Sequence, residues 1–277
     1  DAYMVMTAFS SHTRDFHWLK DNIGDTDHAV LTDVTAAYAG INVQGPNSRA
    51  LLSKVTPEDL SNEAFPFGSS RMIEVGYATV RASRISYVGE LGWELWVPSE
   101  MALHVYEVLM EAGEEFDVAN VGMHAMNSLR LEKGYRHWAH DIADEDPPIE
   151  AGLGFAVKYD KPGGFIGRDA LLKQKENGVV SKRLVQFLMK DPEVMIYHNE
   201  PIVRDGEICG YITGGMYGHT LGGSVGLGYV NNPIESGGVN ADYVNSGTYE
   251  IEVACERFAA DASLRPMYDP KNERIKS

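Results

Sequence analysis

The sequence predicts an α+β protein that continues into a small all-β domain at its C-terminal end. Up to about residue 178, helix-like runs are interspersed with runs in which apolar and polar residues alternate, as they do in half-buried strands. Beyond Glu176-Asn-Gly178 the pattern changes to short strand-like runs separated by turns, which is typical of a small barrel or sandwich. We therefore predict two domains, residues 1–178 and 179–277.

The first elements follow from local patterns. A strand is expected at residues 2–8, a helix at 13–22, a second strand at 38–43 and a short helix at 48–55. Asn47 stands where this short helix should begin, and asparagine is a preferred residue at helix N-termini. Because the chain opens directly inside the first strand-like run, we expect it to be a fragment of a longer polypeptide.

A glycine-bracketed hairpin is expected in the middle of the first domain. Apolar and polar residues alternate over 72–80, and further strands are predicted at 84–87 and 93–97. Gly89 and Gly92 bracket a tight turn between the last two of these strands. The remaining elements predicted for this domain are helices at 99–113, 124–135 and 165–175 and a strand at 150–158.

The second domain is predicted to consist mainly of short strands. They are expected at residues 183–188, 201–203, 207–213, 225–230 and 249–254. Asp205-Gly206 is a strong hairpin turn between two of them. The glycine-rich run at 222–228 precedes a strand rather than a helix, so it lacks the geometry with which dinucleotide-binding loops hold phosphates.

The hairpin also carries the most informative pair of side chains. Tyr87 and Glu94 are expected on the strands on either side of the turn, close enough to share one pocket. An aromatic ring beside a buried carboxylate suits a flat heterocycle with amide-like N–H donors, because the rings stack and the carboxylate accepts two hydrogen bonds. From these residues alone the other interpretation, a hairpin whose Glu94 is merely solvated, stays open.

The run Tyr87-Val-Gly-Glu-Leu-Gly-Trp-Glu94 resembles the pterin-contacting signature of the glycine-cleavage T-protein (aminomethyltransferase) superfamily. Further similar segments follow in the family's order at residues 41–46, 127–138, 149–153, 165–171 and 227–230. Lys133-Gly-Tyr-Arg-His-Trp138 and the closing run at 268–276 are most similar to the folate-binding C-terminal half of sarcosine and dimethylglycine dehydrogenases.

The resemblance implies a T-protein-like domain and a C-terminal barrel that together use tetrahydrofolate as the cofactor. It implies that Tyr87 and Glu94 hold the folate, with Trp138 near the ligand. No catalytic residue is assigned, because the acidic segment that assists in the family has no counterpart in this sequence. The chain departs from many T-proteins at Met126, which stands where an arginine contacts the folate tail, and Arg130 is expected to be structural, paired with Glu132 or a neighbouring loop.

The function implied is tetrahydrofolate-dependent one-carbon transfer, as the C-terminal half of a sarcosine- or dimethylglycine-dehydrogenase-like flavoenzyme. FAD is expected only on an N-terminal portion absent from this sequence, or on a partner subunit, and the substrate is expected to be an N-methyl amine or another one-carbon donor. Two alternatives stay open. One is a stand-alone aminomethyltransferase or folate-dependent demethylase, and the other is a non-catalytic subunit resembling the regulatory subunit of pyruvate dehydrogenase phosphatase.

Composition limits the other function classes. The formal net charge of −16 argues against nucleic acid or an anionic membrane as the principal partner. Two cysteines are too few for a disulfide scaffold and suit a reducing compartment. In line with the resemblance, a location in a bacterial cytoplasm or the mitochondrial matrix is expected. His137, His140 and Asp141 lie close together, but no second cluster completes a metal site, so no metal is predicted.

Overall fold

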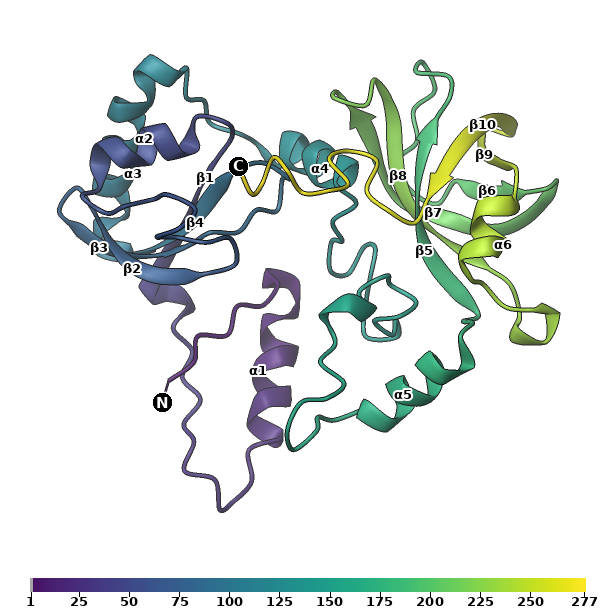
Figure 1. The fold of residues 1–277 in the computed structure, drawn as a ribbon, viewed down its shortest axis with the longest axis horizontal. Helices are drawn as coiled ribbons and strands as arrows, with labels where there is room; N and C mark the ends of the chain where they lie inside the picture. Colours follow the sequence, from purple (N-terminus) through teal and green to yellow (C-terminus); the bar gives the residue numbers. More distant parts are fainter. Residues whose placement is uncertain (1) are drawn as a thin grey trace. The chain divides into compact units, whose positions relative to one another are not determined.

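The computed structural model describes residues 2–277 and divides into two compact units. The first unit comprises the chain up to Ser86, Glu90–Asn120 and Arg274–Ser277. The second comprises Tyr87–Gly89 and Val121–Glu273. Both units combine helices and strands (Figure 1), which agrees with the predicted α+β class.

The first unit is built on a four-stranded antiparallel sheet with the order β1-β4-β3-β2. Its strands are β1 (Tyr38–Gln44), β2 (Ser70–Val75), β3 (Ala78–Ser83) and β4 (Gly92–Pro98). The helices α2 (Ser48–Val55) and α3 (Ala102–Gly113) pack with one face of the sheet around a single apolar cluster that includes Leu52, Val80 and Trp93. A third helix, α1 (His12–Asp21), has no buried residue.

Three strand predictions in this unit are wrong. Residues 2–8 are not a strand, because a run of strand-forming residues does not make one when no neighbouring strand supplies hydrogen bonds. The run at 72–80 is the hairpin β2–β3, broken at Gly76, whose left-handed backbone (φ +57°) turns the chain. Residues 84–87 belong to the irregular loop between β3 and β4, so Tyr87 is on a loop and not on a strand.

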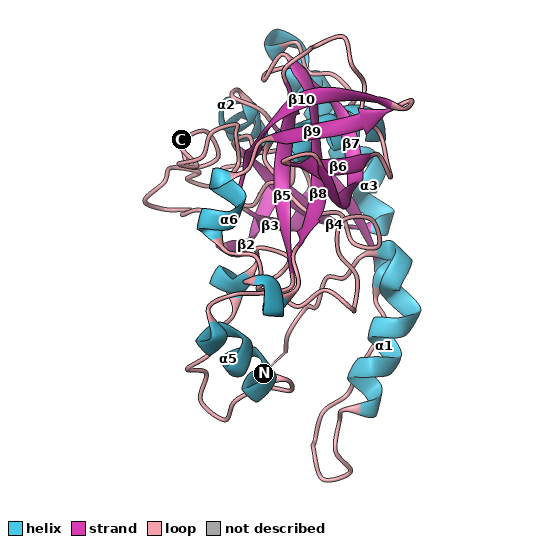
Figure 2. Ribbon diagram, turned by 90° about the vertical axis from the view of Figure 1, so that its right-hand side faces the viewer, coloured by secondary structure: helices cyan, strands magenta, loops and turns pink. Residues whose placement is uncertain are grey.

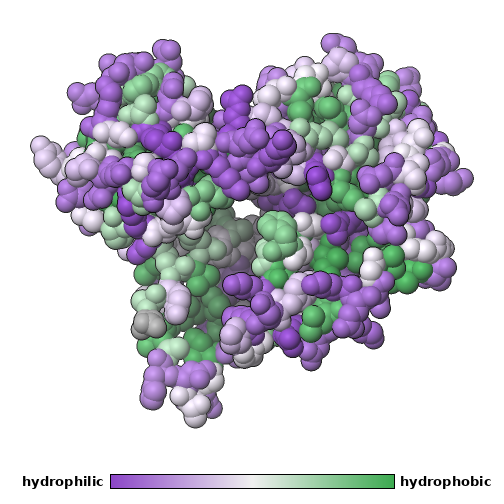
Figure 3. Space-filling view, in the orientation of Figure 1, coloured by the Kyte–Doolittle hydropathy of each residue, from purple (hydrophilic) through white to green (hydrophobic). Residues whose placement is uncertain are grey.

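Apolar side chains are exposed along the N-terminal segment and α1 (Figure 3). The fully or largely exposed ones include Tyr3, Val5, Phe9, Trp18 and Val30. This segment therefore contributes little to the core of the first unit.

The second unit contains a closed six-stranded barrel with the order β10-β5-β8-β7-β6-β9 (Figure 2). The strands are β5 (Lys182–Met189), β6 (Pro201–Arg204), β7 (Glu207–Gly218), β8 (Gly223–Asn231), β9 (Tyr249–Val253) and β10 (Glu256–Ser263). The predicted barrel is confirmed, as is the turn at Asp205-Gly206, where both residues have positive φ, as a type I′ turn requires. The last strand, β10, and the short helix α6 (Ala241–Ser246) were not predicted.

Two further helices belong to the second unit, α4 (Met123–Glu132), which packs against β7 and β8, and α5 (Arg168–Asn177). Between them the predicted strand at 150–158 is wrong. The chain turns at Gly152 (φ +72°), where a Cβ would lie 2.4 Å from Nη2 of Arg136, and continues as a 3-10 helix, Gly154–Ala156. No helix within residues 2–277 is long and apolar enough to cross a membrane.

Short 3-10 helices complete the described chain. Besides Gly154–Ala156 they are Phe9–Ser11, Thr35–Ala37, Ser99–Met101, Glu114–Phe116 and Ile234–Ser236.

Candidate functional site

Glu94 lies in the central strand β4 of the first unit, on the face of the sheet that points away from the apolar cluster. Its neighbours Trp93 and Leu95 are fully buried in that cluster, and side chains alternate between the two faces of a strand. Glu94 pairs across the sheet with Asn42 of β1 and Ser83 of β3. The position of this carboxylate is therefore set by a strand that is hydrogen-bonded on both sides.

The Glu94 carboxylate is half-buried, and within residues 2–277 it has no hydrogen-bond partner and no ion pair. Burial raises its pKa above the usual value of a glutamate, and no nearby cation offsets this effect. A desolvated carboxylate without a donor is unfavourable in the free protein. It is the arrangement expected of a group that takes its hydrogen bonds from a ligand.

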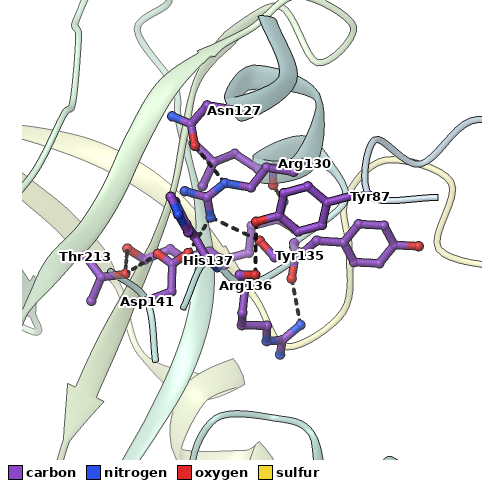
Figure 4. Close-up of polar contacts among 12 residues, drawn as sticks. Tyr87, Asn127, Arg130, Tyr135, Arg136, His137, Asp141 and Thr213 are labelled. Atoms are coloured by element: carbon purple, nitrogen blue, oxygen red, sulfur yellow. Dashed lines mark hydrogen bonds and ion pairs between the residues drawn. The ribbon is translucent and has the colours of Figure 1, made fainter. Parts of the chain in front are cut away.

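Tyr87 is held at the surface of the second unit by its hydroxyl group. The hydroxyl donates a hydrogen bond of 3.0 Å to the backbone carbonyl oxygen of Arg136, and the ring stacks on Tyr135 with 6.2 Å between centroids (Figure 4). Burial raises the pKa of Tyr87. Because the hydroxyl is occupied, the ring is the part of Tyr87 that is left for a ligand.

Gly89 and Lys133 pack closely beside Tyr87. Gly89 has a left-handed backbone (φ +76°), and a Cβ at this position would lie 3.0 Å from the Lys133 side chain. Lys133 is fully buried and pairs with Asp269, with 2.9 Å between Nζ and Oδ2. The glycine of the predicted signature is therefore required for packing as well as for backbone conformation.

A buried ion pair between Arg130 and Asp141 organises the segment that follows α4 (Figure 4). Arg130 also donates to Asn127 Oδ1 (2.7 Å) and to the carbonyl oxygen of Tyr135 (3.0 Å). Asp141 accepts hydrogen bonds from the Thr213 hydroxyl group (2.6 Å) and from the backbone N–H of His137 (2.8 Å). The prediction that Arg130 is structural agrees with this network, although its partner is in the following loop and is not Glu132.

A cavity of about 480 Å³ lies over this network in the second unit. Its walls come from Tyr87, from α4 and the segment after it, from residues 197–198 before β6, and from β7. The side chains that line it include Met126, Asn127, Arg130, His137, His140 and His198. Met126, at the position where the resemblance implies an arginine in many related proteins, lines this cavity.

The charge of this cavity depends on its histidines, because Asp141 neutralises Arg130. The rings of His137 and His140 are 4.4 Å apart between centroids, and His198 lies edge-on to His140. Burial, and then the neighbouring His140, lower the pKa of His137, so His137 is neutral near pH 7. Within residues 2–277 no group of three or more histidine, cysteine, aspartate or glutamate side chains is arranged to hold a metal ion.

Trp138 lies in the same segment but is not among the residues that line the cavity. It is half-buried and forms an isolated bridge with Ile142. Tyr87 and Trp138 belong to the second unit, whereas Glu94 belongs to the first. Thr213 and His198 were not predicted from the sequence, because they lie more than sixty residues beyond α4 and have no local signal that connects them to it.

These features define a class of protein: a mixed α/β chain with a closed C-terminal barrel and, on a central strand, a carboxylate that has no partner among the described residues. The family model described as the GCVT N-terminal domain matches residues 1–161, and that of the glycine cleavage T-protein C-terminal barrel domain matches residues 182–269. The chain belongs to the glycine-cleavage T-protein family.

Characterised relatives include longer polypeptides. The chain is 40% identical over 276 residues to 4-methylaminobutanoate oxidase (formaldehyde-forming) of Paenarthrobacter nicotinovorans, covering 100% of this chain and 32% of that protein. It is 41% identical over 246 residues to human mitochondrial sarcosine dehydrogenase, covering 89% of this chain and 26% of that protein. The chain thus spans about a third or less of the length of these relatives.

Among solved structures, the glycine cleavage system aminomethyltransferase T from Bartonella henselae has the same fold. It superimposes with a TM-score of 0.77 at 24% sequence identity, over 94% of this chain and 67% of that one. This similarity agrees with the predicted T-protein-like fold.

Proposed function

We propose that this chain is the folate-binding part of an enzyme that carries out tetrahydrofolate-dependent one-carbon transfer. The observation that carries the proposal is the Glu94 carboxylate, which is half-buried on a rigid strand and has no donor within residues 2–277. The pterin ring of a folate offers adjacent N–H donors, which fit the two oxygens of one carboxylate. Membership of the T-protein family supports the same ligand.

In this proposal Glu94 holds the pterin by two charge-assisted hydrogen bonds. From the family resemblance, and not from their placement relative to Glu94, we also propose that Tyr87 and Trp138 of the second unit contact the cofactor. Tyr87 would do so through its ring, since its hydroxyl group is bonded to Arg136. Tetrahydrofolate supplies the nitrogen nucleophile that takes up the one-carbon unit. The part of this chain is to bind and orient the cofactor and to exclude water from it.

The complete enzyme we propose is a sarcosine- or dimethylglycine-dehydrogenase-like flavoprotein acting on an N-methyl amine. FAD would be bound by a further domain or a partner subunit. The relatives that are three times longer than this chain support this proposal. We also propose a domain boundary near residue 178, which lies between the segments matched by the two family models. The proposed location is a bacterial cytoplasm or the mitochondrial matrix.

The proposal is tested by measuring the affinity for 5-formyltetrahydrofolate by calorimetry. Glu94→Gln should weaken binding by roughly tenfold to a hundredfold, because a charge-assisted hydrogen bond contributes about 1.5–3 kcal/mol. The matched control is Glu74→Gln, which removes an exposed carboxylate from the same face of the same sheet and should leave the affinity unchanged. Equal affinities for the Glu94→Gln variant and the unmodified chain would exclude Glu94 from the site.

The pH dependence gives a second readout of the same contact. Only the ionised carboxylate accepts both hydrogen bonds, and the pKa of Glu94 is raised by burial. Affinity should therefore fall as the pH drops through this raised pKa, at a higher pH than for an ordinary glutamate. In Glu94→Gln this part of the pH dependence should disappear.

A further inference from the structure

A second cavity, of about 330 Å³, lies at one end of the barrel in the second unit. Its apolar walls include Val180 and Val239, which belong to the barrel's core cluster, and Leu264, which packs against that cluster. Helix α5 contributes Gln174 and Lys175 from the other side. The mouths of β-barrels are among the places where proteins commonly bind small molecules.

Arg183 points into this end of the barrel. It lies at the start of β5, two and four residues before Val185 and Phe187, which are both in the barrel core. Residues at this spacing share one face of a strand, so the Arg183 side chain is on the inner face of the barrel wall. It is half-buried and lines the cavity.

One edge of the Arg183 guanidinium group has no partner. Nη1 donates to the backbone carbonyl oxygen of Ile149. Nε and Nη2, which together form the side-on fork of an arginine, have no acceptor within residues 2–277, and no carboxylate there pairs with Arg183. Burial lowers the pKa of Arg183, and no neighbouring acidic group offsets this effect.

An unpaired, partly desolvated cation is unexpected in a chain whose formal net charge is −16. Lys175, the second cation at this cavity, also has no ion pair within the described residues and lies 4.4 Å from the centroid of the Tyr159 ring. The carboxylate of Glu150 is hydrogen-bonded to Gln174 (3.2 Å) and does not pair with either cation. The positive charge at the barrel mouth is therefore available to a ligand.

We propose that this cavity binds a small organic monocarboxylate with an apolar body. The carboxylate would accept two hydrogen bonds from the Nε–Nη2 edge of Arg183, a geometry that a planar guanidinium group favours. The apolar body would lie against Val180 and Val239. The cavity offers the fork of Arg183 and the exposed ammonium group of Lys175 beside apolar walls. This arrangement suits a ligand with a single negative charge better than a phosphate dianion. This site shares no residue with the proposed folate site.

The test is calorimetric titration of the 277-residue chain, without folate, with 3-phenylpropanoate and with its neutral analogue 3-phenylpropanamide. The acid should bind at least about tenfold more tightly than the amide, and Arg183→Gln should remove most of this preference. Lys175→Gln should weaken binding of the acid by about twofold to fivefold. Lys173→Gln, which removes an exposed cation from the same helix, is the matched control and should have no effect.

A second readout keeps the proposal testable if Arg183→Gln does not fold. In the isotope-labelled, unmodified chain, the resonance of the Arg183 Nε–H group should shift on titration with the acid and not with the amide. Equal binding of acid and amide would overturn the proposal. So would the absence of binding at acid concentrations up to about 10 mM, a dissociation constant that corresponds to about −2.7 kcal/mol. An unmoved Arg183 resonance would overturn it as well.

Discussion

Two buried or half-buried carboxylates of this protein have opposite surroundings. Asp141, in the second unit, is paired with Arg130 and accepts hydrogen bonds from Thr213 and His137. Glu94, in the first unit, has neither a cation nor a donor within residues 2–277. A buried charge that is fully paired within the protein belongs to the folded structure, because removing a partner would leave it uncompensated. A rigidly held charge without a partner is instead available to a ligand. Asp141 is therefore a structural residue and Glu94 a candidate ligand-binding residue.

The largest expected effect comes from breaking the satisfied network. Arg130→Met should destabilise the second unit by about 3–5 kcal/mol, because it leaves the Asp141 carboxylate buried without its cation. Denaturant unfolding followed by circular dichroism measures this loss. The double variant Arg130→Met with Asp141→Leu should recover much of the stability, because no unpaired charge is left. A double variant as unstable as the sum of the single variants would contradict a direct coupling between the two residues.

A smaller effect is expected at Gly89, which supports the loop that carries Tyr87. Gly89→Ala should cost about 1–2 kcal/mol from the left-handed backbone alone, and more because the added Cβ approaches Lys133 at 3.0 Å. Gly68→Ala is the matched control, since Gly68 has a similar φ (+82°) but nothing within 4 Å of the added atom. The difference between the two free energies of unfolding isolates the contact with Lys133, and equal losses would mean that this contact does not matter.

The smallest expected effect has the opposite sign and concerns the unsatisfied carboxylate. The pKa of Glu94 is raised by burial, so the folded state binds this proton more tightly than the unfolded state does, and folding loses stability as the pH rises through the raised pKa. Glu94→Gln should therefore stabilise the first unit near pH 7, by about 0.5–1 kcal/mol. Below the usual pKa of a glutamate this gain should vanish.

Unfolding curves of the Glu94→Gln variant at neutral and at acidic pH measure this change. Together with the loss of folate affinity, the gain would show that the residue is kept for binding at the expense of stability. A loss of stability at pH 7 would instead indicate that Glu94 has a partner in the folded protein.

Local sequence by itself determined the elements whose signals are complete over a few residues. Five of the six barrel strands follow from short strand-like runs between turns, and Asp205-Gly206 determines a tight turn because both residues tolerate positive φ. The signature from Tyr87 to Glu94 led to the T-protein family, to which the chain belongs. The roles of Tyr87, Glu94 and Trp138 remain predictions.

Only the tertiary structure decided which polar groups are satisfied. Residues 2–8 have the composition of a strand but no neighbouring strand, and Thr213 reaches Asp141 only because β7 packs beside α4. The unpaired edge of Arg183 likewise cannot be predicted from the sequence. It depends on the hydrogen bond to the carbonyl group of Ile149, and on the fact that no carboxylate within residues 2–277 pairs with this side chain. Hydrogen-bond partners far apart along the chain leave no local pattern, and for this reason both the satisfied and the unsatisfied charges of this protein had to be found in three dimensions.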